Sequence, residues 1–193
     1  MPAAEISLMC LSNIQVQLIE FRSFCEEDVD EILAFELENR EYFERWFSRK
    51  HDVHDCGQLL IHEICQPGNI RQYEHSFIVR YLGRIIGRTT LHAIDRVVAN
   101  SAAMEYCVAE RFSGCGIATI VVAKTVRFAF DQLALWRVDA SVRSDNTPSI
   151  RVLQKCNFQY FSKTERRFPD QSGKKIHDFL HFSSYHNFPV RLP

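Results

Sequence analysis

The chain has little glycine and no hydrophobic run that approaches the length of a membrane span. Only 7 of its 193 residues are glycine, and a transmembrane helix needs about 20 consecutive apolar residues. The N-terminal stretch carries Glu5 and lacks a basic segment, so it is not typical of a secretory signal. We therefore expect a cytoplasmic protein that has no membrane partner.

The sequence also lacks a C-x-x-C pair, and its cysteines are odd in number and widely spaced. Both features argue against a disulfide framework and favour reduced thiols in a reducing compartment. The seven cysteines are Cys10, Cys25, Cys56, Cys65, Cys107, Cys115 and Cys156.

No excess of charge of either sign is present. The chain has 23 Lys and Arg against 24 Asp and Glu, so nothing in this balance favours a nucleic-acid partner. An acidic run at Glu26–Glu31 is interpreted as the solvated start of a helix, where the helix dipole favours negative charge. The length suits a single domain over residues 1–193.

The order of the expected elements is strand, helices, three strands, helix, strand, helix and two strands. Hydrophobic periodicity places Val29, Ile32, Leu33 and Leu37 on one face of the first long helix. The order predicts a mixed α/β (α+β) domain with a central sheet. The expected strands are 16–22, 75–81, 84–92, 102–109, 137–142, 159–166 and 176–184; the expected helices start near 26, 41, 58, 117 and 147.

Two of the few glycines, Gly114 and Gly116, lie between an expected strand and an expected helix, in the stretch RFSGCGIA. Backbone N–H groups at a helix start are unpaired and carry partial positive charge. Glycine lets such a backbone approach an anion closely. The stretch is therefore a candidate phosphate-binding loop, although it matches neither the P-loop pattern nor the dinucleotide fingerprint.

This stretch resembles the acyl-CoA loop of the GNAT superfamily of N-acetyltransferases, whose motif is [RQ]-x-x-G-x-[GA]. Residues 111–116 match it in full, and the usual Ile117-Ala118 follows. Downstream, the segment DNTPSIRVLQKCNF resembles the family's N-x-x-S-x-x-x-L-x-x-x-G-F pattern. Asn157 stands where the family has glycine, and asparagine tolerates the left-handed conformation needed there.

The segments ELENREYFERW and KKIHDFLHF further resemble the branch that contains ribosomal-protein N-terminal (alanine/serine) acetyltransferases. The resemblance runs from about residue 16 to residue 184. It implies a mixed, mostly antiparallel sheet flanked by helices, with strands that splay apart around an acyl-CoA cleft.

The resemblance implies that acetyl-CoA is the cosubstrate. Main-chain groups of Cys107 and Val108 would bind its pantetheine arm, Thr119 would add a hydroxyl, and Asn146 would bond the cofactor or shape the turn before the helix. Amides of the loop would hold the pyrophosphate; the loop residues are Arg111, Phe112, Ser113, Gly114, Cys115, Gly116, Ile117 and Ala118.

A general base helps an amine to attack the thioester as its free base, and Glu105 is the candidate. It interrupts an otherwise apolar strand, where a carboxylate is costly unless it is paired or useful. The alternatives are a glutamate at a sheet surface or one satisfied by Arg88. Relatives often carry the acid two positions earlier, where this chain has Ala103; Glu110 is a lesser candidate.

The departing thiolate needs a proton or a hydrogen bond. Many relatives use a tyrosine at the position of Leu153, so Ser149 is the remaining candidate. In the first turn of its helix the dipole would favour a developing anion. The alternative is that Ser149 only caps the helix.

The resulting hypothesis is direct acetyl transfer to a primary amine in a ternary complex, with a protein N-terminus as the leading acceptor. Alternatives are a small amine (a polyamine, an amino acid or an aminoglycoside), a non-catalytic acyl-CoA-binding module, and a nucleotide-binding domain. A homodimer is expected by analogy with relatives. No metal is expected, because the spacing of His51, His54 and Cys56, with His62 and Cys65 further on, matches no standard zinc pattern.

Overall fold

A computed structural model of the chain describes residues 15–46, 73–169 and 175–186, which share one seven-stranded sheet. The strand order is β1-β2-β3-β4-β5-β7-β6. The strands are β1 (Ile19–Ser23), β2 (His75–Tyr81), β3 (Arg84–Asp95), β4 (Ser101–Val108), β5 (Arg137–Arg143), β6 (Gln159–Pro169) and β7 (Ile176–Tyr185). The α-helices are α2 (Val29–Glu38), α3 (Arg40–Glu44), α5 (Ile117–Asp131) and α6 (Thr147–Lys155).

All seven predicted strands are present. The first is shorter than predicted because residues Val16–Leu18 form a 3-10 turn before β1. The tight turn between β2 and β3 uses two left-handed residues, Leu82 at φ 49° and Gly83 at φ 77°. The predicted helix near residue 58 lies outside the described residues.

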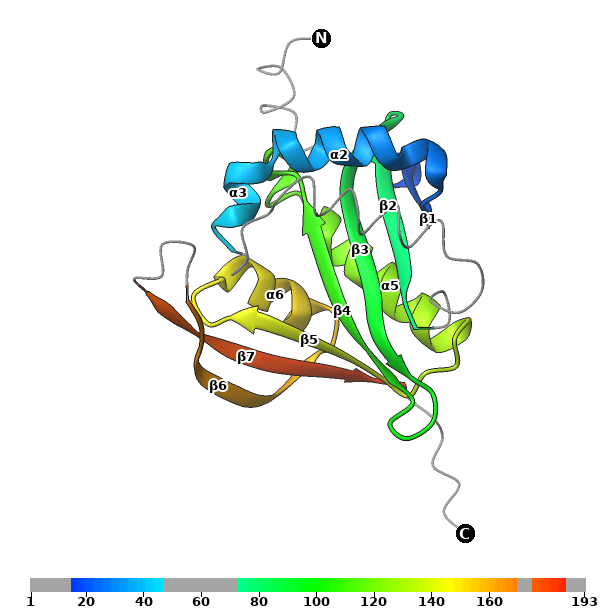
Figure 1. Ribbon diagram of the computed structural model, residues 1–193. Coiled ribbons are helices and arrows are strands. Elements are labelled where there is room, and N and C mark those ends of the chain that lie inside the picture. Colours follow the sequence, from blue (N-terminus) through cyan, green and yellow to red (C-terminus); the bar gives the residue numbers. More distant parts are fainter. Residues whose placement is uncertain (1–14, 47–72, 170–174, 187–193) are drawn as a thin grey trace.

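Helices α2 and α5 cover opposite faces of the sheet (Figure 1). Successive side chains of a strand point to opposite faces, and two neighbours in β3 show this. Arg88 contacts Glu36 of α2, whereas the Oγ1 of Thr89 lies 3.3 Å from that of Thr125 in α5. Helix α5 contributes to both hydrophobic clusters of the core, whereas α2 contributes to one of them.

The buried face of α2 differs from the predicted one. Ile32 is buried as expected, but Phe35 and Glu36 are buried with it, while Leu37 is 61% exposed. The face is rotated because Glu36 reaches the Arg88 guanidinium over the sheet, a pairing that hydrophobic periodicity does not detect.

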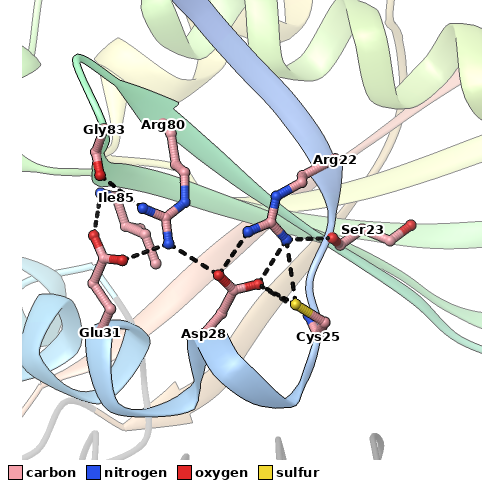
Figure 2. A network of polar contacts seen from close by, with 8 residues as sticks. All are labelled: Arg22, Ser23, Cys25, Asp28, Glu31, Arg80, Gly83 and Ile85. Atoms are coloured by element: carbon pink, nitrogen blue, oxygen red, sulfur yellow. Dashed lines mark hydrogen bonds and ion pairs between the residues drawn. The ribbon is translucent and has the colours of Figure 1, made fainter.

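The acidic run at the start of α2 is solvated only in part: Glu26, Glu27 and Asp30 are exposed as the sequence favours, but Asp28 and Glu31 are engaged with the sheet. Asp28 is buried, and its carboxylate receives hydrogen bonds of 2.7 Å from each of two Arg22 nitrogens and one of 2.9 Å from Arg80 (Figure 2). Glu31 contacts the same Arg80 and accepts a hydrogen bond from the Ile85 amide at 2.9 Å. The run therefore fastens the start of α2 to β1, β2 and β3.

Strands β4 and β5 are parallel neighbours over three residue pairs only, Ser101–Ala103 with Arg137–Asp139. All other strand pairs in the sheet are antiparallel. Beyond this short contact the two strands diverge, as Figure 1 shows. This confirms the predicted mixed, mostly antiparallel sheet with splayed strands.

Helix α6 begins just beyond β5, and its N-cap residue is Asn146. The Asn146 Oδ1 accepts a hydrogen bond from the Ser149 amide at 3.2 Å, with a proline at the helix start. After the helix, Asn157 has φ 61°, which confirms the left-handed residue predicted there.

Candidate active site at the strand splay

The glycine loop connects β4 to α5 as the sequence predicts. A 3-10 turn at Glu110–Phe112 leads to Gly114 and Gly116, which are left-handed at φ 79° and 81°. Gly116 caps α5, whose first N–H groups have no partner within the helix. The loop thus offers backbone amides at a helix N-terminus, the arrangement that binds phosphate groups.

Two loop side chains anchor this arrangement instead of facing solvent. Phe112 is 7% exposed and Ile117 is 0% exposed, and both belong to the core cluster under α2. Of the predicted cofactor residues, these two can contribute only backbone groups to a ligand at the surface.

Helices α2 and α3 tie down the same loop from the other side. The Asn39 Oδ1 accepts a hydrogen bond from the Glu110 amide at 3.2 Å. Glu38 Oε1 lies 2.9 Å from an Arg111 nitrogen. The hydroxyls of Tyr42 and Ser113 are 3.4 Å apart. Arg111 is thus engaged with α2, and the loop geometry depends on contacts that the glycine motif alone does not reveal.

The strand before the loop exposes main-chain groups to the splay. Pairing of β4 with β5 stops at Ala103, so Cys107 and Val108 lie beyond it. Burial raises the pKa of the Cys107 thiol to about 12, which leaves that thiol neutral and unreactive. The positions of Cys107 and Val108 fit the predicted main-chain role, which remains a prediction.

Cys115 corrects the expectation of reduced thiols, because it is in a disulfide. Cys25, Cys107 and Cys156 are free. An odd number of widely spaced cysteines argues against a framework of several bridges, but it does not argue against a single disulfide.

Ser149 and Asn146 meet at the start of α6, on the β5 side of the splay. The Ser149 Oγ lies 2.7 Å from the Tyr106 Oη, which comes from β4. Sequence reasoning missed Tyr106; its position one residue after Glu105, in a strand expected to border the cofactor, was the available signal. Thr119, in the first turn of α5, is half-buried.

Glu105 lies in β4 two residues past the last pairing with β5. Its side chain is 58% exposed, and its Oε1 lies 3.7 Å from the His92 Nε2. Arg88 does not satisfy it, because Arg88 contacts Glu36 instead. Burial raises the pKa of nearby Glu74, and the charge of Glu105 acts in the same direction. Glu105 is thus an open carboxylate on the α2 face of the sheet.

The segment with His51, His54, Cys56, His62 and Cys65 lies outside the described residues. Within the described ranges, no group of three or more His, Cys, Asp and Glu side chains could hold a metal ion. In the same ranges, no helix is long and apolar enough to cross a membrane.

A seven-stranded sheet with this splay, a glycine loop at the start of α5 and a capped α6 define the architecture of an acetyltransferase. The acetyltransferase (GNAT) domain family matches residues 19–159. The chain belongs to this family.

Proteins similar to this chain include acetyltransferases with different acceptors. "Probable N-acetyltransferase YjcK" of Bacillus subtilis is 29% identical over 135 residues, which are 68% of this chain and 75% of that protein. The ribosomal-protein-S5-alanine acetyltransferase of Vibrio fischeri has a TM-score of 0.76 at 18% identity, over 90% of this chain and 96% of that one. The spermidine N-acetyltransferase of Vibrio cholerae, solved with CoA and spermine, has a TM-score of 0.74 at 17% identity, over 88% and 96%.

Proposed function

We propose that the protein transfers the acetyl group of acetyl-CoA to the α-amino group of a protein N-terminus. The amine nitrogen forms a bond to the thioester carbonyl carbon, the C–S bond breaks, and its electron pair leaves on sulfur. Glu105 takes the proton from the nitrogen, directly or through a water molecule, and Ser149 donates a hydrogen bond to the departing sulfur. No covalent acetyl-enzyme is formed.

The observation that carries the choice of acceptor is the exposure of Glu105. A carboxylate that solvent reaches can take a proton directly or through water, which suits an amine that is already partly deprotonated. With a pKa of about 8, roughly a tenth of an α-amine is free base at pH 7; for lysine, with a pKa of about 10.4, the fraction is below about one in a thousand.

A polyamine is the second candidate, because Glu74 and Glu105 are two carboxylates that interact on one face of the sheet. Two carboxylates attract an acceptor with several positive charges. The solved spermidine acetyltransferase is consistent with this candidate.

Free-thiol release from acetyl-CoA separates the two acceptors. Both peptides have the same sequence, which includes an internal lysine. The test peptide begins with a free serine or alanine, and the N-terminus of the control peptide is blocked. We expect turnover with the test peptide, little with the control and little with spermidine. Faster turnover with spermidine than with every N-terminal peptide would favour the polyamine instead.

A further inference from the structure

Tyr106 is a polar side chain at the splay to which the mechanism above gives no role. It extends from β4, and its Oη lies 2.7 Å from the Ser149 Oγ and 3.4 Å from the Ser149 carbonyl oxygen. Because Ser149 follows β5 in the chain, this contact joins the segments on the two sides of the splay. It is therefore placed to control the direction of the Ser149 hydroxyl.

Either hydroxyl could donate in this contact, and the phenol, as the more acidic of the two, is the better donor. A serine hydroxyl has one proton and two acceptor lone pairs. Burial raises the pKa of Tyr106 to about 12, and the described titratable group that faces it, Cys156, is a thiol whose pKa burial also raises. Both groups are therefore neutral near pH 7, and the phenol keeps its proton for donation.

The main-chain amide of Ser149 is occupied separately, by the Asn146 Oδ1 at 3.2 Å. Within the residues that the structure describes, the Ser149 Oγ has no hydrogen-bond partner other than Tyr106. A phenol that donates to this oxygen leaves the serine proton available and makes the serine a stronger donor through cooperativity.

We propose that Tyr106 is a positioning residue that accepts nothing from Ser149 and donates to it, so that the serine proton is directed at the sulfur of CoA. This inference rests on the proposed function, in which Ser149 stabilises the departing thiolate. Tyr106 does not touch the reacting atoms; it acts through Ser149.

The position of Leu153 gives this contact a reason. Many relatives use a tyrosine at this position, but here Leu153 is 1% exposed and packs in the core between α5 and the sheet. The chain therefore lacks a phenol on α6. Tyr106 supplies one from the neighbouring strand, and Ser149 carries its effect to the cofactor.

The first test needs no acceptor, because it titrates the thiol of CoA bound to the full chain. Thiolate absorbance is followed against pH, with desulfo-CoA complexes subtracted to remove the protein's own tyrosine and cysteine signals. A hydrogen bond to the thiolate lowers its pKa, so we expect the pKa of bound CoA to rise by about 1 in Tyr106→Phe. Ser149→Ala should give the same rise, and the double variant should add nothing.

The second test divides the effect between kcat and KM. We expect Tyr106→Phe to lower kcat about fivefold, as loss of one neutral hydrogen bond allows, with unchanged affinity for CoA. In the Ser149→Ala background the same change should have no effect, and Ser149→Thr, which keeps a hydroxyl, should retain sensitivity to Tyr106→Phe. Tyr160→Phe is the control, because Tyr160 is an exposed tyrosine on β6.

The outcomes separate the inference from the function beneath it. Absence of saturable CoA binding to the folded wild type would overturn both. Binding with an equal thiol pKa in the wild type and in Tyr106→Phe would overturn the inference and leave the acetyltransferase proposal standing. Equal losses of kcat from Tyr106→Phe with and without Ser149 would do the same.

Discussion

Two groups of acidic side chains in this protein lie in opposite environments. The Asp28 group is closed: the Asp28 side chain is 3% exposed and is held by Arg22 and Arg80 (Figure 2). The Glu105 group is open: Glu105 is 58% exposed, and its Oε1 lies 3.7 Å from the His92 Nε2. The charge of Asp28 is paired with guanidinium groups, whereas the Glu105 carboxylate is accessible to solvent.

This difference separates a structural carboxylate from the one that we propose as the general base. The Arg22 guanidinium holds the pKa of Asp28 well below its usual range, so this carboxylate cannot take a proton near neutral pH. Glu105 has no arginine partner of this kind and lies beside the splay. A residue that must accept a proton belongs in the second setting.

The largest effect on stability should come from Asp28→Asn. It leaves two arginines without the carboxylate that holds them, and breaking a buried ion pair typically costs about 3 kcal/mol or more. Urea unfolding, compared at equal pH, measures the loss of free energy. Glu105→Gln is the matched control and should stay within about 0.5 kcal/mol of the wild type. A loss below 1 kcal/mol for Asp28→Asn would contradict the closed description.

When activity is measured instead of stability, Glu105→Gln should have a larger effect than Asp28→Asn. Removal of a general base lowers turnover by about 100-fold, whereas affinity for acetyl-CoA should not change because the loop and β4 backbone remain. Steady-state thiol release and calorimetric titration measure the two quantities. Unchanged turnover at neutral pH would remove Glu105 from the mechanism.

The closed group should also set the response of stability to acid. Because the folded-state pKa of Asp28 is depressed, its contribution is present above the unfolded pKa of about 3.9 and is lost as pH falls. We expect the free energy of unfolding to drop by about 2 kcal/mol from this group between pH 5 and pH 2. The drop should be smaller in Asp28→Asn. Identical pH profiles for the two proteins would contradict this assignment.

The sequence predicts the open group better than the closed one. Glu105 is visible because it is a charge in an apolar strand, and the loop is visible because Gly114 and Gly116 are rare residues at a strand-to-helix junction. Asp28 is not visible in this way, since an acidic run before a helix has the same composition whether it is solvated or buried. Its partners Arg22 and Arg80 come from strands that sequence order alone does not bring together.

The Tyr106–Ser149 contact could not be predicted from the sequence, for a related reason. Residues 43 positions apart meet only because β4 and β5 diverge and α6 follows β5. Hydrophobic alternation shows which face of β4 a side chain takes, but not which helix covers that face near the splay. Asn39 is similar, because its contact with Glu110 depends on how α2 ends over the loop.

The smallest effect on stability should come from His92→Gln, which tests whether the open group contributes to the fold at all. The His92 side chain is 36% exposed and its carboxylate partner is 58% exposed, and an exposed ion pair contributes between about 0 and 1 kcal/mol. We therefore expect a change in the free energy of unfolding below about 0.5 kcal/mol, measured by urea unfolding at pH 6 and pH 8. A loss as large as that of Asp28→Asn would show that the Glu105 group is structural. If His92→Gln leaves the free energy of unfolding unchanged at both pH values and Glu105→Gln loses turnover, Glu105 serves the reaction with the acceptor and not the stability of the fold.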